Sequence, residues 1–222
     1  MRSPLRLLFA VALVVLPTAL SAQISPDPTT SFLSGSNPDG PWRFGMKDAA
    51  LGTFTDLTVY SPYPGGVRWS DGSTFGGVYY SGDLNLGGGT ITLHPFVGGQ
   101  LAALRFVAPS AGSYSFVGSF LDGDSPTSDV YIALNNSSLL FNAFISNNDP
   151  PLAFSSTLSL SAGQYVDFLA GAGGNGYGFD SVNLLLNPQD PGDVGVVPEP
   201  ASVALLATGL LGLFAVSRAR SA

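Results

Sequence analysis

Cysteine is absent from this chain of 222 residues, and histidine and glutamate each occur once, as His94 and Glu199. Without cysteine there is no disulfide bond, no thiolate nucleophile and no zinc site with cysteine ligands. A single histidine has no second imidazole with which to hold a metal, and no G-x-S-x-G motif of a serine hydrolase occurs. The stability of the protein must therefore come from an ordinary hydrophobic core, for which the length suffices.

Basic side chains are also scarce, since 8 lysines and arginines stand against 15 acidic residues. Four of the basic residues lie near the chain ends, and the other four are Arg43, Lys47, Arg68 and Arg105. All the acidic residues lie between positions 23 and 200, so this part carries four cations and fifteen carboxylates, a formal charge of −11. Nucleic acid and anionic lipid headgroups repel such a surface, and we expect neither as a partner.

The first residues have the three parts of a secretory signal peptide. Arg2 and Arg6 form a basic start, residues 7–16 are an apolar segment, and Pro17 ends that segment before a few small residues. This order predicts a signal peptide over residues 1–22 that is removed on export. An uncleaved anchor is the alternative, and the shortness of the apolar segment argues against it.

The last residues combine a stiff triplet, a long apolar run and a basic end. The prolines of the Pro-Glu-Pro triplet at 198–200 exclude a helix there, so we expect it to be extended. Residues 201–216 carry no charge. As a helix rising ~1.5 Å per residue they span about 24 Å, slightly less than the ~30 Å of a hydrocarbon core. The pattern predicts a transmembrane helix over 201–216 and a cytoplasmic basic end at 218–220. A core helix is the alternative, but the run has no polar face.

The stretch VPEPASVALLATGLLGLFAVSRAR, residues 197–220, resembles the PEP-CTERM sorting signal of Gram-negative bacteria, although its basic end is Arg-Ala-Arg instead of a continuous arginine run. The resemblance implies recognition by exosortase, a membrane-embedded cysteine transpeptidase that removes the tail. It further implies a precursor held transiently in the inner membrane, and then a product at the cell surface or in the extracellular matrix. The candidate sorting residues are Pro198, Glu199, Pro200, Arg218 and Arg220.

Between these ends, short runs of aromatic and β-branched residues are separated by Gly, Pro, Asn and Asp. Such spacing is typical of β-strands joined by turns, and no convincing amphipathic helix lies between the runs. Tyr114, Phe116 and Phe120 share one face of a predicted strand, opposite serines. We expect an antiparallel jelly-roll β-sandwich over residues 23–187, followed by a flexible linker over 188–197. The predicted strands are 57–60, 78–80, 90–94, 101–107, 114–120, 130–134, 139–145, 157–160, 165–170 and 179–186.

Two stretches of this central region resemble known proteins. The sequence NPDGPWRFG, residues 37–45, resembles an Asn-Pro-x-Gly-x-Trp-x-Tyr-Gly opening found in many PEP-CTERM proteins, with Phe44 where tyrosine is usual. Residues 93–186 resemble a jelly-roll domain of the carbohydrate-binding-module type from exported bacterial proteins. The turns that carry this second resemblance, such as Ala-Pro-Ser-Ala-Gly at 108–112, belong to the scaffold. They therefore imply the fold more directly than sugar binding.

Aromatic side chains in loops are candidates for a ligand platform, because their flat faces stack on sugar rings. The candidate residues, several of which lie beside glycine and proline, are Trp42, Trp69, Tyr63 and Tyr177. Burial in the core is the alternative, and it is the usual fate of large aromatic side chains.

Aspartates offer a second candidate site. In the Asp-Gly-Asp-Ser loop, Asp122 and Asp124 supply the hard oxygen ligands that Ca²⁺ prefers, although the ligand set is incomplete. Solvated turn residues are the alternative, and no cofactor other than a structural calcium is expected. The stretch GAGGNG at 171–176 precedes a predicted strand instead of a helix, so we interpret it as a loop and not as a dinucleotide site.

Three functions remain open at this point. The first is an exported, exosortase-sorted protein of the cell surface or extracellular matrix whose noncatalytic β-sandwich binds exopolysaccharide. The second is a purely structural matrix protein that associates with itself. The third is a polysaccharide hydrolase, which would have to use two aspartates because Glu199 lies in the tail. No pair of aspartates stands out for this role, so we expect the protein not to be an enzyme.

Overall fold

The structure, a computed structural model, describes residues 22–24, 27–73, 75–81, 90–124 and 127–187. The predicted signal peptide except for its last residue, the linker at 188–197 and the sorting tail with its predicted transmembrane helix lie outside these ranges. None of the helical residues that are described forms a segment long and apolar enough to cross a membrane.

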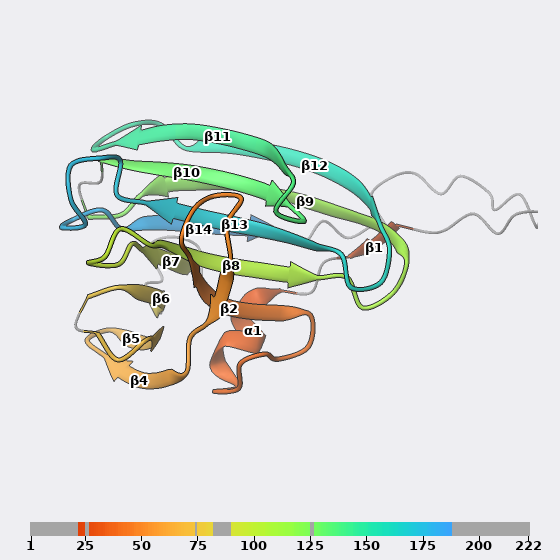
Figure 1. The fold of residues 1–222 in the computed structure, drawn as a ribbon, viewed down its shortest axis with the longest axis horizontal. Coiled ribbons are helices and arrows are strands. Elements are labelled where there is room, and N and C mark those ends of the chain that lie inside the picture. The colour runs from red at the N-terminus through yellow and green to blue at the C-terminus, as the bar shows by residue number, and fades with distance from the viewer. Residues whose placement is uncertain (1–21, 25–26, 74, 82–89, 125–126, 188–222) are drawn as a thin grey trace, which may run out of the picture. The chain divides into compact units, whose positions relative to one another are not determined.

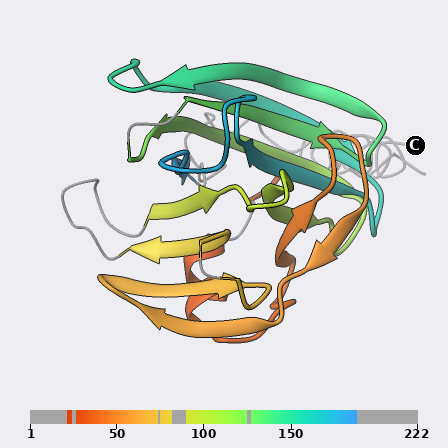
Figure 2. The ribbon, with the colours of Figure 1, turned by 60° about the vertical axis from the view of Figure 1, so that its left-hand side comes forward.

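The described strands form two sheets that lie face to face, as Figure 1 and the turned view in Figure 2 show. In the eight-stranded sheet, hydrogen-bonded neighbours follow the order β1-β9-β14-β7-β6-β5-β4, and β12 pairs with β9. The six-stranded sheet has the order β11-β10-β13-β8-β2-β3. The strands of the first sheet are β1 (Ala22–Ile24), β4 (Val59–Tyr63), β5 (Gly66–Ser70), β6 (Gly77–Ser81), β7 (Thr90–His94), β9 (Gly112–Asp122), β12 (Leu152–Leu160) and β14 (Val182–Asn187). Those of the second are β2 (Trp42–Lys47), β3 (Phe54–Asp56), β8 (Leu101–Val107), β10 (Thr127–Leu134), β11 (Ser138–Ser146) and β13 (Tyr165–Gly171).

The strands from β7 to β14 form nested antiparallel pairs. The innermost pair is β10 with β11, and the next pairs outward are β9 with β12, β8 with β13 and β7 with β14. This ribbon of paired strands folds across both sheets, so that each sheet receives two of the four pairs. Such an arrangement is a jelly roll, and the predicted fold class of the central region is confirmed.

Aromatic side chains fill the space between the two sheets. Along β9 burial alternates, and the buried positions include Tyr114, Phe116 and Phe120, as predicted. The ring of Phe116 contacts Phe106 of β8 and Phe168 of β13, with centroids 5.3 and 5.7 Å apart. Ring pairs of this kind add about 0.5–1.5 kcal/mol each beyond their buried area. They join the two sheets in a chain that has no disulfide to do so.

The sequence did not predict a helix or the strands β2, β3 and β5. The helix α1 (Pro28–Leu33) begins where Asp27 caps it, the carboxylate accepting a hydrogen bond from the Thr29 N–H at 2.9 Å. Its Phe32 packs edge-on against Phe44, with ring centroids 4.7 Å apart. β2 lies in a stretch rich in proline and glycine, and it becomes a strand because it pairs with β8.

The NPDGPWRFG stretch is held in place by its first residue. The side-chain nitrogen Nδ2 of Asn37 donates hydrogen bonds to the carbonyl oxygens of Phe44, at 2.6 Å, and Leu57, at 2.8 Å. Its Oδ1 accepts a hydrogen bond from the Phe44 N–H at 2.9 Å. Because Phe44 and Leu57 are buried, these bonds satisfy backbone groups that water does not reach. Asn37 therefore fixes the course of the chain between the helix α1 and the strand β2.

A buried ion cluster lies on the outer face of the six-stranded sheet. Asp167 Oδ1 accepts from Arg105 Nε at 2.6 Å, and its Oδ2 accepts from Arg105 Nη2 and Lys47 Nζ, both at 2.8 Å. The Lys47 ammonium also donates to the Ala50 carbonyl at 2.8 Å and to Asn136 Oδ1 at 2.7 Å, so each of its three protons has an acceptor. Burial lowers the pKa of Lys47, and the hydrogen bond to Asp167 acts against this shift.

Aromatic rings and a second ion pair surround this cluster. The guanidinium of Arg105 lies 3.7 Å from the ring centroid of Tyr165 and 4.1 Å from that of Phe54. Both distances are typical of cation–π contacts. Arg43 forms an ion pair with Asp56 nearer the surface, where both side chains are about a third exposed. Three of the four basic residues of the domain are therefore bound to carboxylates.

Replacing Asp167 with asparagine should destabilise the protein strongly. In Asp167→Asn, Lys47 and Arg105 stay buried without their counter-ion, so we expect the free energy of unfolding to fall by about 3–5 kcal/mol. The control is Asp56→Asn, which removes the pair with Arg43 nearer the surface and should cost no more than about 1 kcal/mol. Urea unfolding followed by tryptophan fluorescence measures both changes. Equal losses in the two variants would contradict a structural role for the buried cluster.

Candidate ligand-binding site

A pocket of about 750 Å³ lies over the outer face of the eight-stranded sheet. Val78 of β6 and Leu93 of β7 are paired and face the core, so their neighbours along each strand face outward into the pocket. The loops before β6, after β9 and before β14 supply its walls. We call this site the aromatic pocket, and its lining consists of Tyr63, Phe75, Tyr79, Tyr80, Thr92, His94, Gly123, Asp124, Tyr177, Gly178, Phe179, Ser181 and Asn183.

The floor of the aromatic pocket is polar. Thr92 of β7 is paired with Tyr79 on one side and with Asn183 on the other, so the three side chains stand in a row across the sheet. Thr92 Oγ1 donates to Asn183 Oδ1 at 2.6 Å, and Asn183 Nδ2 donates to the Asp122 carbonyl at 3.1 Å. These bonds fix the orientation of the amide at the base of the pocket.

His94 closes the floor at the end of β7. Its Nδ1 lies 2.8 Å from the carbonyl oxygen of Pro95. A carbonyl oxygen can only accept, so Nδ1 carries a proton and donates this bond, which leaves Nε2 as the other hydrogen-bonding atom of the ring. The ring stands at the edge of the aromatic cluster, with its centroid 6.3 Å from that of Tyr79. The histidine thus adds a polar group to the lining of the pocket.

Aromatic rings form the walls, and several of them are exposed to solvent. Tyr63 contacts Tyr79 edge-on with ring centroids 4.8 Å apart, and the ring centroids of Phe75 and Tyr177 are 6.2 Å apart. Tyr63, Phe75 and Phe179 have 49, 53 and 74 % of their surface exposed. Apolar rings gathered at one site and left open to water are typical of surfaces that a ligand covers.

Tyr79 connects the floor to one of these walls. Its hydroxyl donates a hydrogen bond to the carbonyl oxygen of Phe75 and thereby ties down the loop before β6. Burial raises the pKa of Tyr79, while the neighbouring Arg68 guanidinium acts to lower it. The phenol therefore stays neutral and keeps its proton for this bond.

Phe179 has an unfavourable backbone as well as an exposed ring. Its φ is +63°, in the left-handed region that bulky side chains seldom occupy. Holding a residue there costs of order 1–3 kcal/mol, and residues of this kind cluster at functional sites. The loop thus keeps a phenylalanine where glycine would fit with less strain, at the mouth of the aromatic pocket.

The two aspartates predicted as calcium ligands bind different backbone amides. Asp124 Oδ1 accepts from the Ser181 N–H at 2.8 Å, whereas Asp122 Oδ2 accepts from the Asn148 N–H at 2.7 Å. Asp124 lines the aromatic pocket, and Asp122 does not. Within the described ranges no group of three or more histidine or acidic side chains is placed to hold a metal. The calcium site remains a prediction.

The structure corrects the expectation for the two tryptophans. Trp42 is fully buried in β2 beside Phe106, with ring centroids 5.2 Å apart. Trp69 is 4 % exposed and stacks on Phe44, with centroids 6.1 Å apart. Neither indole presents a face to a ligand, because the core surrounds both. Tyr63 and Tyr177, the other two candidates, both line the aromatic pocket.

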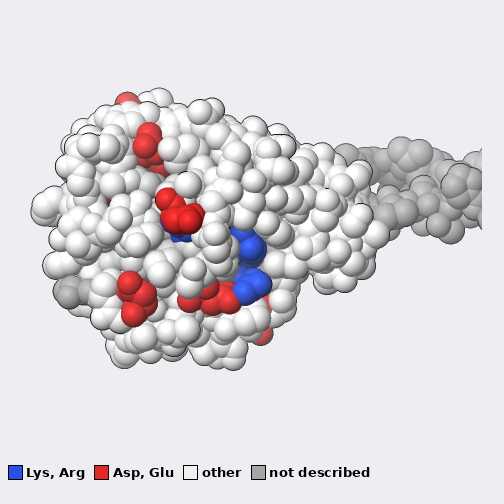
Figure 3. Space-filling view, in the orientation of Figure 1, with Lys and Arg blue, Asp and Glu red and all other residues white. Residues whose placement is uncertain are grey.

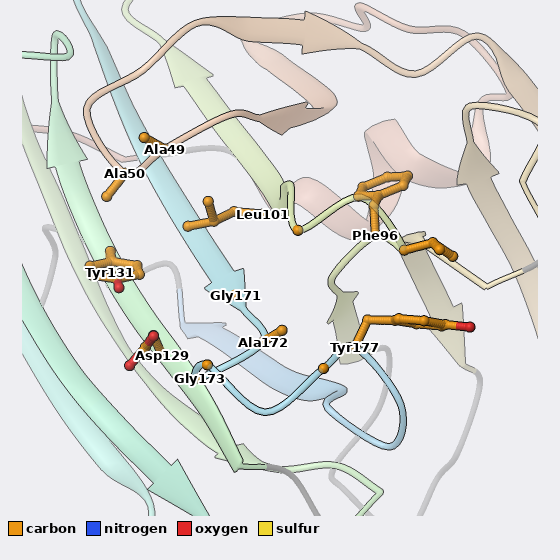
Figure 4. A pocket seen from close by; sticks show the side chains of 14 residues that line it. Ala49, Ala50, Phe96, Leu101, Asp129, Tyr131, Gly171, Ala172, Gly173 and Tyr177 are labelled. Atoms are coloured by element: carbon orange, nitrogen blue, oxygen red, sulfur yellow. The ribbon is translucent and has the colours of Figure 1, made fainter.

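A second pocket of about 460 Å³ opens on the other sheet, beside the glycine-rich loop (Figure 4). Figure 4 shows Asp129 and Tyr131 of β10 on one side of it and Phe96 and Tyr177 on the other. Burial raises the pKa of Tyr131, and Asp129 adds to the shift. Residues 171–176 form the end of β13 and a turn, so the predicted loop is confirmed. Tyr177 lines both pockets.

Sequence reasoning missed several residues of the aromatic pocket. Phe75, which lies in a loop beside Gly76, and Phe179 were overlooked. Phe179 was placed in the predicted strand 179–186, but the observed strand β14 begins at Val182 and leaves Phe179 in the loop before it. Thr92 and Asn183 lie inside predicted strands, at outward-facing positions. Only the pairing of β7 with β14 brings them together, and that pairing is not visible in the residue pattern.

Comparison with protein families gives one match, at the C-terminal end. Residues 196–220 match the family model of the PEP-CTERM protein-sorting motif. The chain carries a PEP-CTERM sorting signal. This motif implies an exported protein whose precursor passes through the membrane and is sorted by exosortase. The matched residues lie outside the described part of the structure, so the assignment depends on sequence.

No curated protein matches the chain. Among solved structures, the chain is similar to the CBM51 module of Clostridium perfringens GH95 in complex with methyl-galactose, with 8% identity, a TM-score of 0.33 and coverage of 68% of this chain and 91% of that one. It is also similar to the GH26-CBM35 β-(1,4)-mannanase of Podospora anserina, with 18% identity, a TM-score of 0.28 and coverage of 51% and 24%. A third is the isomalto-dextranase of Arthrobacter globiformis T6 complexed with panose, with 16% identity, a TM-score of 0.29 and coverage of 68% and 30%. At these levels of similarity no functional conclusion follows from them.

Replacing Phe179 with glycine should stabilise the protein while opening the pocket. Glycine adopts a positive φ without steric cost, so we expect Phe179→Gly to raise the free energy of unfolding by about 0.5–1 kcal/mol. Phe75→Gly is the matched control, because Phe75 is also an exposed loop phenylalanine but lacks a positive φ. The free energy of unfolding of Phe75→Gly should fall by up to about 1 kcal/mol. Thermal unfolding measures both, and a destabilised Phe179→Gly would show that the backbone is unstrained.

Proposed function

We propose that the exported domain binds a neutral polysaccharide in the aromatic pocket without cleaving it, and that this ligand is an exopolysaccharide of the cell surface or matrix. The observation that carries the proposal is the group of solvent-exposed rings, among them Tyr63, Phe75 and Phe179, around a polar floor. Apolar surface of this kind is unfavourable in water and becomes favourable once a ligand covers it. The strain at Phe179 supports the same conclusion, because it holds one of these rings in the open.

A sugar ring matches both parts of the pocket. Its C–H face is apolar and can lie on an aromatic wall, and each 100 Å² of apolar surface buried in this way contributes roughly 2.5 kcal/mol. Its hydroxyl groups both donate and accept hydrogen bonds, and the pocket provides polar partners in Thr92, His94, Asn183 and Asp124. A few fixed polar groups among aromatic side chains are the usual composition of small-molecule sites.

The charges favour a neutral ligand over an acidic one. Among the described residues that line the pocket, Asp124 is the one acidic residue and none is a lysine or arginine. Residues 23–200 as a whole carry fifteen acidic side chains against four basic ones. Uronic acids and other anionic sugars would approach against this field.

The same lining supports binding without hydrolysis. Glycosidases commonly place two carboxyl groups on either side of the scissile bond, roughly 5 to 9.5 Å apart. The described lining of the aromatic pocket supplies only Asp124, whose Oδ1 is already hydrogen-bonded to Ser181. Among the described residues, no second carboxylate lines the pocket to act as nucleophile or base.

The two ends of the chain give the route by which the domain meets its ligand. The signal peptide at residues 1–22 directs export, and the apolar segment at 201–216 holds the precursor in the inner membrane. Exosortase then acts at the Pro-Glu-Pro triplet and releases the domain to the cell surface or matrix. A binding domain without its own catalysis suits a location where polysaccharide must be retained.

Loss of an aromatic wall should weaken polysaccharide binding. In Phe75→Ala we expect the dissociation constant to rise at least about tenfold, which corresponds to ~1.4 kcal/mol. Electrophoresis of the purified protein through gels that contain a neutral glucan, mannan or galactan measures this as lost retardation. Alginate serves as the anionic comparison and should retard neither protein.

Phe144→Ala is the matched control for this experiment. Phe144 lies on β11, outside the pocket, and is 49 % exposed against 53 % for Phe75. The Phe144→Ala variant should bind the neutral polysaccharides as the unaltered protein does. Equal retardation of all three proteins on every neutral polymer, or equal loss in both variants, would rule out the aromatic pocket as the binding site.

Removal of the sorting triplet should stop processing. With alanines in place of Pro198, Glu199 and Pro200, we expect tail-bearing precursor to remain in the membrane of a host that has a matching exosortase. Mass spectrometry of the membrane and secreted fractions follows the tail. Alanines at 189–191, outside the matched residues, are the control and should leave processing unchanged. An unaltered mature mass after replacement of the triplet would contradict sorting through it.

A further inference from the structure

Two neighbouring edge strands of the sandwich carry no charge. β11 is the last strand of the six-stranded sheet and β12 pairs with β9 alone, so within the described chain each has one unpaired side. Their sequences, SLLFNAFIS and LAFSSTLSL, contain no Lys, Arg, Asp, Glu or Pro. Both strands run along the same border of the sandwich in Figures 1 and 2. Proteins usually protect such edges with charges or prolines, because an open strand edge pairs readily with another.

The side chains of β11 add apolar surface to this edge. Leu139, Leu140 and Phe144 are exposed, and Phe141 and Ala143 are half-buried at the open border of the core. One irregularity occurs, a register shift that leaves Leu140 without a partner on β10. Such bulges help to protect an edge. Beyond it, residues 141–146 are regularly paired with β10, so their other side offers an ordered row of backbone N–H and C=O groups.

We propose that two copies of the chain associate through this edge, the 141–146 segment of β11 pairing antiparallel with the same segment of the second copy about a two-fold axis at residue 142, 143 or 144. The pairing would join two six-stranded sheets into one continuous sheet and cover the half-buried Phe141 and Ala143 of both copies. On the same border, β12 of each copy would come to lie beside the uncharged β12 of the other. This association is independent of the aromatic pocket, which lies on the other sheet.

Charge determines both the occupant and its orientation. Residues 23–200 of each copy carry a formal charge of −11, so two copies repel each other. Figure 3 shows carboxylates scattered over the face of the domain. Contact is therefore easiest where carboxylates are absent, which is true of both strands along this border. A strongly charged partner would gain nothing at such an edge, whereas a second copy brings an edge of identical character.

Asp149 selects the antiparallel arrangement. It follows β11 by three residues and accepts a hydrogen bond from the Ser146 N–H at 2.7 Å. Because each carboxylate lies at Ser146, the two Asp149 carboxylates of an antiparallel pair centred on residue 142, 143 or 144 are roughly 13 to 26 Å apart at about 3.3 Å per residue. That separation exceeds the Debye length of about 10 Å. A parallel pair would bring them to about 5 Å from each other, where like charges repel.

The absence of cysteine provides a direct test. Single cysteines are introduced into the full chain in detergent as Asn142→Cys, Ala143→Cys and Phe144→Cys. Each of these positions lies opposite the same position of the second copy in a different antiparallel register. Opposed Cβ atoms lie about 4.5–5.5 Å apart, close to the ~3.5–4.5 Å of a disulfide. After oxidation with diamide, we expect one of the three variants to give mostly disulfide dimer on a non-reducing gel.

Val59→Cys is the matched control, since Val59 is exposed on β4, the edge strand at the far end of the eight-stranded sheet. β4 differs from β11 in containing Pro62. The dimer yield of this control should be at least tenfold lower. As much dimer from Val59→Cys as from the β11 variants would show random collision and overturn the proposal.

A charge placed on the edge gives a second, independent measurement. Asn142 is exposed, so Asn142→Lys should stay folded, with a cooperative unfolding transition, while sedimentation at micromolar concentration shifts from dimer to monomer. The unaltered chain must sediment as a dimer under the same conditions. A monomeric unaltered chain, or cysteine variants that stay monomeric with the parent unfolding curve, would refute pairing through β11.

Discussion

The pairing of β7 with β14 joins the first and last strands of the jelly roll, and both the core and the aromatic pocket depend on it. Leu93 and Val182 are paired across these strands and face the core, while the next pair, Thr92 and Asn183, faces outward and forms the pocket floor. The alternation of side chains along a strand thus links the two regions residue by residue. A shift of one position would expose Leu93 and bury the floor, so the packing of the core also preserves the site.

The sequence predicted the jelly roll because its strands have strong local patterns. The observed bounds of β7 and β8 agree with those predicted, and the alternation along β9 placed its aromatic face correctly. Strands β2 and β5 contain residues that favour turns, and they form only because neighbours pair with them. For the site, Tyr63 and Tyr177 were found, but Trp42 and Trp69 were not separated from them, because residue type does not distinguish an exposed ring from a buried one. Phe179 depends on a backbone angle that no pattern of residue types reveals.

The few basic residues of the domain are used inside its structure. Arg105 and Lys47 are buried on Asp167, and Arg43 is bound to Asp56. The carboxylates that remain give the surface its acidic character, which keeps copies apart and turns acidic polymers away. The aromatic pocket and the β11 edge each gather several exposed apolar residues on this surface. Attraction at either place depends on apolar and polar contact, so moderate changes in salt should affect it little.

The first and last strands of the described domain pair with neighbouring parts of β9. β1 pairs with residues 113–115 of β9, and the last residue of β14, Asn187, lies opposite Val117 of the same strand. The aromatic pocket is at the other end of β14, where Ser181 and Asn183 line it. The described domain therefore has a polarity along its strands. A polymer gripped in the pocket and a pull exerted through residue 187 would act on opposite ends of β14, so that strand would carry any tension in shear along its whole length.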